Sequence, residues 1–381
     1  MKPRVLLLLA YAAASHRHWS SRLQQMFPEF AWTCLSLPPR HFNWTIRGNS
    51  LLWGFGQQSV LQQRFDLLVA TSMVDLSSLR GFVPALSAIP TIVYFHENQF
   101  SYPAGVQRET NVEPQLVPLY AALCANRIVF NSNYNRSTFL LGAQNLFKRL
   151  PDTIPEQVTA RLDKSCVVPV PVPVPVAAAR LKPTHPKPQS KYLEVVWNHR
   201  WEYDKGADLL LELCRQIEER GYPVRLHIAG EQFRTQPTEF QQIDKLLASH
   251  ASQLQLDRGQ FGFIADQTSY AILLASCDVV LSTARHDFQG LAVQEACMHG
   301  CTPLAPADLA YPEYLGQEFL YHATEALEAT ATAICARLLH WHAILAQGES
   351  LPKPDLSAYS MESLRPRYAN LFAELLDRPE G

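Results

Sequence analysis

The chain has 381 residues, of which 47% are hydrophobic and 18% charged, and its 33 basic side chains nearly balance its 35 acidic ones. This length predicts two domains, because single hydrophobic cores rarely grow beyond about 250–300 residues. The composition excludes a wholly disordered chain, and the near-neutral charge excludes a uniformly basic coat for nucleic acid. No apolar run reaches the roughly 20 residues that a membrane-spanning helix needs.

The N-terminus has two interpretations. Lys2 and Arg4, followed by the apolar run 5–14, fit a signal peptide. The same residues also fit a buried first strand at 4–10 that leads into a loop, and this is the interpretation that we favour.

Short apolar runs predict strands in both halves of the chain, with helical periodicity between them. The predicted strands are 5–10, 65–70, 91–95, 127–131, 192–197, 224–229, 260–263 and 279–282, and predicted helices include 208–219, 269–275 and 291–299. Strands that alternate with helices indicate an α/β fold of two Rossmann-like domains with parallel sheets. In such sheets ligands bind beyond the carboxyl ends of the strands, so polar residues directly after the apolar runs are the candidate site residues.

A proline-rich segment, 167–190, predicts the domain boundary. Alternating prolines remove backbone donors and favour an extended, stiff connector between an N-terminal domain at 1–166 and a C-terminal domain at 191–360. Residues 361–381 are expected to hold an amphipathic helix, 361–376, that crosses back to the first domain. Residues 1–190 carry 18 Lys and Arg against 9 Asp and Glu, and residues 191–381 carry 15 against 26. A basic half suits a polyanion or an anionic membrane surface.

Eight cysteines are scattered without a Cys-x-x-Cys pair. A chain of this size does not need disulfides, and the ligand pairs of a structural zinc site are missing. We therefore expect reduced, mostly buried thiols in a cytoplasmic protein.

The strongest functional signal follows the predicted strand 192–197. Arg200 and Lys205 flank a short loop that opens a helix near Gly206. Two cations beside the N–H groups of a helix start indicate an anion site, and this pair of cations suits a diphosphate. The alternative is a surface cluster in which the cations pair with Glu202 and Asp204.

A second signal is the segment STARHDFQGLAVQEACMHGCTPLAP at 282–306. Asp287 precedes a helix expected from about Leu291, and Glu295 lies one turn further on the same face. Glu295 could bind a ribose diol and Asp287 sugar hydroxyls, with the N–H groups at Gly290 and Leu291 facing a phosphate. The alternatives are a helix cap for Asp287 and a solvated surface acid for Glu295.

Two polar segments follow strands of the first half. The residues HENQ at 96–99 end the predicted strand 91–95, and the loop YAAASHRHW at 11–19 places Ser15 and His16 at a helix start. Side chains at strand tips indicate a site, although a single histidine there is often structural. The loop lacks the glycines of a dinucleotide fingerprint, and the chain has neither a P-loop nor a GxSxG motif.

Together these segments resemble the retaining glycosyltransferases of the GT-B type, family four. The resemblance rests on the Arg200 and Lys205 spacing, a turn at 261–264, and Asp287 and Glu295 ahead of GCTP at 300–303. The segments SHRHW, SLPPRHFNW, YFHENQFSYP, FNSNYNRSTFL, WNHRWEYDK and ACMHGCTPLAPADLAYPE are similar to the tRNA-queuosine mannosyltransferase family, from residue 15 to about 315. The departures are Asp287, where the first acid is usually Glu, and two alanines at 13–14, where relatives tend to carry glycines.

The resemblance implies transfer of a sugar from a nucleotide sugar, with GDP-mannose expected, to the queuosine of a tRNA anticodon, in a cleft between the domains and without a cofactor or metal. Catalytic roles are implied for Arg200, Lys205, His96 and Asp287. Donor contacts are implied for Glu295, Gly290, Phe288, Gln289, Leu291, Phe263, Ser15, His16 and His199. Acceptor contacts are implied for Glu97, Asn98, Gln99, Trp44 and Arg47. The basic half would then meet tRNA, with Trp44 stacking on a base unless it is simply buried.

Three alternatives stay open. The acceptor could be a lipid or small glycan at a membrane surface, since basic domains also suit anionic membranes. The chain could be a non-catalytic tRNA-binding module, although such a module needs no leaving-group clamp. A two-domain sugar-nucleotide epimerase would share the fold.

Overall fold

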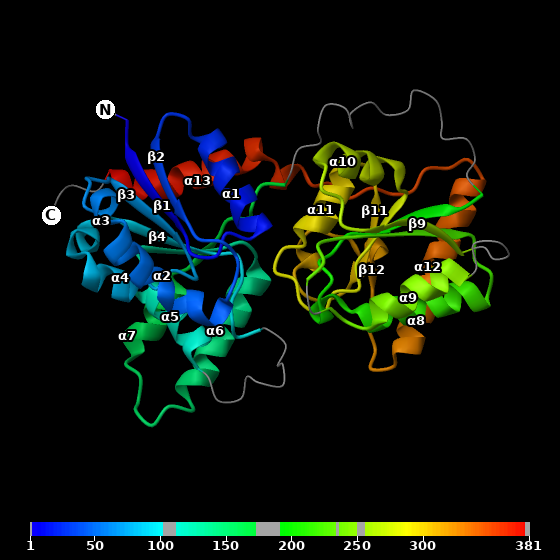
Figure 1. Ribbon diagram of the computed structural model, residues 1–381, viewed down its shortest axis with the longest axis horizontal. Helices are drawn as coiled ribbons and strands as arrows, with labels where there is room; N and C mark the ends of the chain where they lie inside the picture. Colours follow the sequence, from blue (N-terminus) through cyan, green and yellow to red (C-terminus); the bar gives the residue numbers. More distant parts are fainter. Residues whose placement is uncertain (1, 102–111, 173–190, 234–235, 250–255, 378–381) are drawn as a thin grey trace. The chain divides into compact units, whose positions relative to one another are not determined.

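The structure is a computed structural model that describes residues 2–101, 112–172, 191–233, 236–249 and 256–377 (Figure 1). It divides into two compact units, one of Met1–Pro171 with Ser357–Gly381 and one of Val172–Leu356. Each unit contains a parallel sheet with helices on both faces, so the prediction of an α/β fold with two Rossmann-like domains is confirmed. None of the helices in the described residues is long and apolar enough to cross a membrane.

The first unit has a sheet of six described strands in the order β2-β1-β3-β4-β5-β6, all paired in parallel. The strands are β1 (Arg4–Leu9), β2 (Ala31–Ser36), β3 (Leu67–Thr71), β4 (Thr91–Phe95), β5 (Arg127–Phe130) and β6 (Cys166–Val167). The helices are α1 (Ala14–Met26), α2 (Phe42–Gly56), α3 (Gln58–Leu61), α4 (Leu76–Phe82), α5 (Glu113–Cys124), α6 (Asn133–Phe147), α7 (Glu156–Asp163) and α13 (Met361–Leu376). Of the two N-terminal alternatives, the structure has the strand: all but the first residue of β1 are buried, as expected for a strand covered on both faces.

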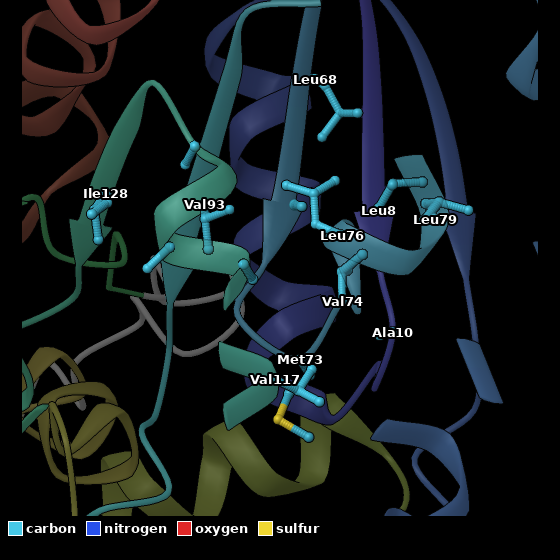
Figure 2. Packing of buried hydrophobic residues seen from close by; sticks show 14 of the residues in the cluster. Leu8, Ala10, Leu68, Met73, Val74, Leu76, Leu79, Val93, Val117 and Ile128 are labelled. Carbon is cyan, nitrogen blue, oxygen red and sulfur yellow. The ribbon is translucent and has the colours of Figure 1, made fainter. Parts of the chain in front are cut away.

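Helices α2, α4 and α5 cover one face of this sheet. Figure 2 shows Leu8, Leu68, Val93 and Ile128 of neighbouring strands in one buried cluster with residues of α4 and α5, which are Leu76, Leu79 and Val117. Burial of this apolar surface is the main favourable term in folding, at about 25 cal/mol per Å². The core therefore fixes the strand ends from which candidate site residues project.

Helices α1 and α13 pack on the opposite face, where α13 (red) lies beside the blue strands in Figure 1. The Trp19 ring stacks on Tyr94 of β4 at 4.3 Å, and Trp19 Nε1 donates a hydrogen bond to Tyr368 OH of α13 at 3.0 Å. The helix expected at 361–376 thus has those bounds and joins the first unit through a buried aromatic cluster.

The proline-rich segment differs from the expectation at its start. Val167 belongs to β6, and Val168 and Val170 are buried in the first unit. Because proline has no N–H, this stretch is held through its carbonyls: Tyr94 OH donates to Val168 O at 2.7 Å, and His18 Nε2 bonds to Pro171 O at 2.8 Å. Residues 167–171 are therefore part of the first unit rather than a connector, and 173–190 lie outside the described residues.

The second unit has six described strands in the order β12-β11-β10-β7-β8-β9, also paired in parallel. The strands are β7 (Leu193–Trp197), β8 (Val224–Ala229), β9 (Leu256–Gly262), β10 (Val279–Leu281), β11 (Thr302–Pro306) and β12 (Leu320–Tyr321). The helices are α8 (Ala207–Glu219), α9 (Glu239–Ser249), α10 (Gln267–Ser276), α11 (Leu291–Met298) and α12 (Leu327–Ala346). One face packs against α8, α9 and α12, and the other against α10 and α11. Strand β7 lies directly beside β10, which brings the two strongest sequence signals to one edge of the sheet.

Candidate functional site

The loop after β7 reaches the end of β10 because residue 206 is glycine. Gly206 has a φ of +68° and opens α8, and a Cβ atom there would lie 2.0 Å from the carbonyl oxygen of Thr283. Thr283 Oγ1 in turn donates to Lys205 O at 2.7 Å. Only glycine permits both the left-handed backbone and this close approach, so the sequence Lys205-Gly206 fixes the lysine against the β10 loop.

Lys205 is buried among acidic and carbonyl groups. Its side chain is 9% exposed, and Nζ donates to His286 O at 2.5 Å. Asp204 Oδ2 lies 3.4 Å and Asp287 Oδ2 3.7 Å from the same nitrogen. The structure thus brings Lys205 and Asp287, which were expected to act on the diphosphate and the sugar, together in one buried cluster.

Asp204 is a member of this cluster that the sequence suggested only as a surface ion-pair partner. Burial by itself would raise the pKa of its carboxyl, but the nearby His286 ring, with Nδ1 3.8 Å from Oδ2, and the charges of Lys205 and Arg200 outweigh it and lower the pKa to about 2. Asp204 is therefore ionised at neutral pH and holds the ammonium of Lys205 in place.

Asp287 is a partner of Lys205 and also binds the N–H of Gly290, the residue that precedes α11. Its Oδ1 accepts from Gly290 N at 2.8 Å, and its Oδ2 accepts from Tyr311 OH at 3.3 Å. Burial opposes the charge of Asp287, yet Lys205 and its other neighbours lower its pKa. The N–H of Gly290 therefore already has a protein partner, and its contact with a phosphate stays a prediction. Gly290 is required for another reason, since its φ is +75° and a Cβ would lie 2.5 Å from Tyr314 OH.

His199 lies at the same edge, two residues after β7. It is 4% exposed, and its Nε2 has no hydrogen-bond partner. Burial, helped by the charge of Lys205, lowers the pKa of His199 to about 4. This ring is therefore neutral at physiological pH, and its buried Nε2 has an unused hydrogen-bonding position.

The remaining donor candidates differ in accessibility. Glu295 and Leu291 are partly buried on α11, whose first turn is tied to β7 because Asn198 Nδ2 donates to Ala292 O at 2.8 Å. Phe288 and Gln289 are buried, and Gln289 Nε2 donates to Gln294 Oε1 at 3.0 Å. Their side chains support the loop, which differs from the expected donor contact.

Two donor candidates are accessible. Phe263, directly after β9, is 61% exposed. The Arg200 side chain is 41% exposed and pairs with Glu202 at 3.0 Å. The ion pair that the sequence offered as an alternative thus exists, but it leaves the guanidinium reachable by a ligand.

In the first unit, His96 follows β4 and is held by ring packing. It is 6% exposed, and its ring centroid lies 4.2 Å from His16, 4.9 Å from Trp19 and 4.8 Å from Tyr94. Its Nε2 has no hydrogen-bond partner. Burial, with the nearby His16 and His18, lowers the pKa of His96 well below its usual value, so the ring is neutral and its Nε2 has an unused hydrogen-bonding position.

His16 and Ser15 lie in the first turn of α1, as predicted. The buried His16 bonds through Nδ1 to the carbonyl of Tyr11, and Ser15 is partly buried. The small residues before them begin α1 without a side-chain cap, since the cap position is Ala13.

The other acceptor candidates after His96 are buried or partly buried. Asn98 is fully buried: its amide nitrogen donates to Asn135 and Thr138, and its oxygen accepts from the N–H groups of Phe100 and Ser101. All its hydrogen-bonding groups are used inside the protein, so its expected acceptor contact is not what the structure supports. Gln99 is 5% exposed and Glu97 is partly buried.

Trp44 and Arg47 lie on α2. Trp44 is 56% exposed, so it is not a core residue, and its indole lies over Gly48, where a Cβ would approach it to 2.5 Å. Arg47 is committed to the protein instead, because Nε pairs with Glu113 at 2.8 Å and Nη1 with Asp75 at 3.1 Å. Trp44 therefore remains an acceptor candidate, whereas Arg47 contributes little free positive charge.

Sequence reasoning missed the buried polar residues that organise these loops. Tyr311 bridges Asp287 and Ser282, and Asn198 also donates to Tyr270 OH at 3.0 Å. No local pattern marks such residues, because their partners are 24 to 94 positions away. Among the described residues, no cluster of His, Cys, Asp and Glu could hold a metal ion.

Two family models match the chain. Residues 4–172 match the model described as tRNA-queuosine alpha-mannosyltransferase N-terminal, and residues 181–336 match glycosyl transferases group 1. A tRNA-queuosine alpha-mannosyltransferase of Drosophila melanogaster is 29% identical over 378 residues, which is 97% of each chain.

Solved structures show the same fold at low identity. Sucrose-phosphate synthase from Thermosynechococcus elongatus is 14% identical, with a TM-score of 0.66 over 98% of this chain and 99% of that one. A UDP-forming trehalose-phosphate synthase from Burkholderia xenovorans is 12% identical, with a TM-score of 0.65 over 99% of both chains. These similarities show the fold alone.

Proposed function

We propose that this chain, which is a glycosyltransferase of the GT-B type and resembles the tRNA-queuosine alpha-mannosyltransferases over nearly its whole length, transfers mannose from GDP-mannose to the queuosine of a tRNA. The anomeric configuration of the sugar is retained, and no metal takes part. The acceptor places the reaction in the cytoplasm. The observation that carries the proposal is the buried Lys205 between Asp204 and Asp287, beside the accessible Arg200.

The second unit binds the donor in this proposal. An ammonium group has three protons, and one of them is donated to His286 O. At 3.7 Å the contact with Asp287 is longer than a hydrogen bond, so Lys205 keeps donor capacity for a phosphate oxygen. Arg200 supplies a second cation, and Glu295 binds the ribose. Because both cations are positioned before the donor arrives, they stabilise the diphosphate as it gains charge.

The reaction breaks the bond between the anomeric carbon and the diphosphate oxygen, and the electron pair leaves with the nucleoside diphosphate. A hydroxyl oxygen of the acceptor forms the new bond to that carbon on the same face. Its proton passes to the departing phosphate oxygen, so no covalent enzyme intermediate is needed. The neutral His96 orients a hydroxyl group by a hydrogen bond in the first unit.

The test is transfer from a panel of nucleotide sugars to tRNA that contains queuosine, followed by mass spectrometry of the released nucleosides. We expect a hexose adduct on queuosine only with GDP-mannose, an α-anomer by NMR, and no product on tRNA that lacks queuosine. Arg200→Gln should lower turnover by on the order of 10²–10³ without unfolding the protein. Transfer to no tRNA, with or without queuosine, would refute the acceptor assignment.

One observation favours a second acceptor class. Helix α2 exposes Trp44, Leu51, Leu52 and Phe55, and it contains no acidic residue. Such a stripe suits a lipid surface, which agrees with the alternative of a lipid acceptor at a membrane. Sedimentation with anionic vesicles is the matching assay: tight vesicle binding together with no affinity for tRNA would favour the lipid acceptor.

A further inference from the structure

A basic cavity lies in the first unit, at the amino end of β5. It has a volume of about 530 Å³ and is lined by Arg127, Arg161 and Lys164, with the amides of Asn126 and Gln157 beside them. No lining residue is acidic. His96 instead follows the carboxyl end of β4, which pairs in parallel with β5. The cavity is therefore at the opposite edge of the sheet from the candidate catalytic histidine.

We propose that this cavity binds a phosphate of the tRNA backbone at a distance from the modified base. The inference rests on the proposed function, since it takes tRNA as the acceptor. A guanidinium fork and an ammonium group are the side chains that match phosphate geometry, and carboxamides add neutral donors. Residues 1–190 carry a net charge of +9, so a polyanion is attracted to this half of the chain.

The three cations are held differently. Arg161 Nη2 donates to Ala125 O at 2.7 Å, which orients its guanidinium while leaving further N–H groups. Arg127 Nε pairs with Glu374 at 2.8 Å, but the two side chains are 34% and 50% exposed. A pair so exposed is weak, so a phosphate can compete with Glu374 for Arg127. Lys164, which follows α7, is exposed and able to swing toward a ligand.

The position of the cavity predicts which kinetic constant depends on it. The four residues of β5 span roughly 13 Å, so a phosphate bound at its amino end lies about that far from the edge where His96 projects. Such a contact cannot touch the reacting atoms. It should strengthen tRNA binding and leave the chemical step unchanged.

The experiment compares Arg161→Gln/Lys164→Gln with the wild type. We expect the Kd and KM for tRNA to rise about tenfold at low salt, and the slope of log Kd against log salt to fall by about 1, because one phosphate contact is lost. The kcat, and the hydrolysis of the nucleotide sugar without acceptor, should stay unchanged. Arg220→Gln/Lys245→Gln in the second unit removes the same charge from exposed positions and is the matched control.

A variant with the opposite effect makes the test sharper. Glu374→Gln frees Arg127 from its ion pair, so tRNA binding should tighten by a few fold while an exposed pair costs little stability. Inorganic phosphate at millimolar concentration, titrated against wild type and double variant, separates free phosphate from tRNA as the ligand. Weakening of phosphate binding alone would assign the cavity to a small anion and overturn the proposal.

The outcomes separate the two hypotheses. If the wild-type protein transfers sugar to tRNA but the double variant has an unchanged Kd and salt slope, the cavity proposal is overturned and the proposed function is left intact. Wild-type protein that neither binds nor modifies tRNA refutes the proposed function itself. Loss of binding to anionic vesicles rather than tRNA in the double variant would assign the cavity to a membrane surface.

Discussion

Among the described residues, Lys205 is the one cation that lies within 4 Å of both Asp204 and Asp287. The substitution Lys205→Met removes this cation. At 3.4 and 3.7 Å, each contact corresponds to roughly 5 kcal/mol of attraction at an effective dielectric of about 20. Desolvation of the buried ammonium offsets much of this, and loss of one partner of a buried pair costs about 3–5 kcal/mol in total. We therefore expect Lys205→Met to lose about 3–5 kcal/mol of unfolding free energy as well as its transferase activity.

Arg200→Met provides the comparison, because Arg200 is expected to act on the same diphosphate but is 41% exposed. Its pair with Glu202 is exposed enough that its loss should cost less than about 1 kcal/mol. Urea unfolding followed by circular dichroism measures both variants. The two substitutions should lower turnover similarly and differ in stability by at least about 2 kcal/mol.

A second substitution tests the cause of the instability. Asp204→Asn in the Lys205→Met background removes a buried charge that has lost its partner, so it should recover part of the stability, with a coupling of about 0.5–3 kcal/mol. Two results would show that the ammonium is not buried between these carboxylates. One is a Lys205→Met variant as stable as the wild type, and the other is a double variant whose loss of stability equals the sum of the two single losses.

Two further predictions concern the same unit. His199 has a folded-state pKa of about 4 and an ordinary value of 6.5, so the unfolded chain binds its proton more readily and stability must fall as the pH drops from about 6.5 towards 4. Between about pH 7.5 and pH 5 the loss from this group is about 2 kcal/mol, and His199→Gln should flatten the profile of urea midpoints by that amount; an unchanged slope would contradict its burial. Gly206→Ala adds a Cβ 2.0 Å from a backbone oxygen at a φ of +68°, so it should lose at least about 2 kcal/mol of stability. Gly348→Ala is the control, because Gly348 is exposed and has a left-handed φ of +80°, but nothing lies within 4 Å of an added Cβ. The difference in lost stability between the two variants measures the steric clash at Gly206. Equal losses of stability would refute the close approach to the oxygen of Thr283.

The sequence was informative wherever a pattern is local. Strands β4 and β8 have the predicted bounds. Strand β4 is five consecutive apolar or β-branched residues, which is typical of a buried parallel strand, whereas β8 is mostly apolar but contains Arg225 and His227. Strand β2 was missed because its exposed edge position gives it a mixed sequence, and β11 because Pro303 and Pro306 argue against a strand. Strands β6 and β12 have only two residues each, too few to carry a pattern.

The residue types of the candidate site could also be predicted from short segments of sequence, because they directly follow β7 and β10. What the sequence by itself determined is that two cations and two acids follow strands of one domain, a set that suits a diphosphate and its sugar. Only the tertiary structure decided that Lys205 is buried and Arg200 accessible, and that the N–H of Gly290 donates to the carboxylate of Asp287. The physical reason is that β7 pairs with β10, more than 80 residues away in the chain, and such pairings depend on the packing of the whole sheet.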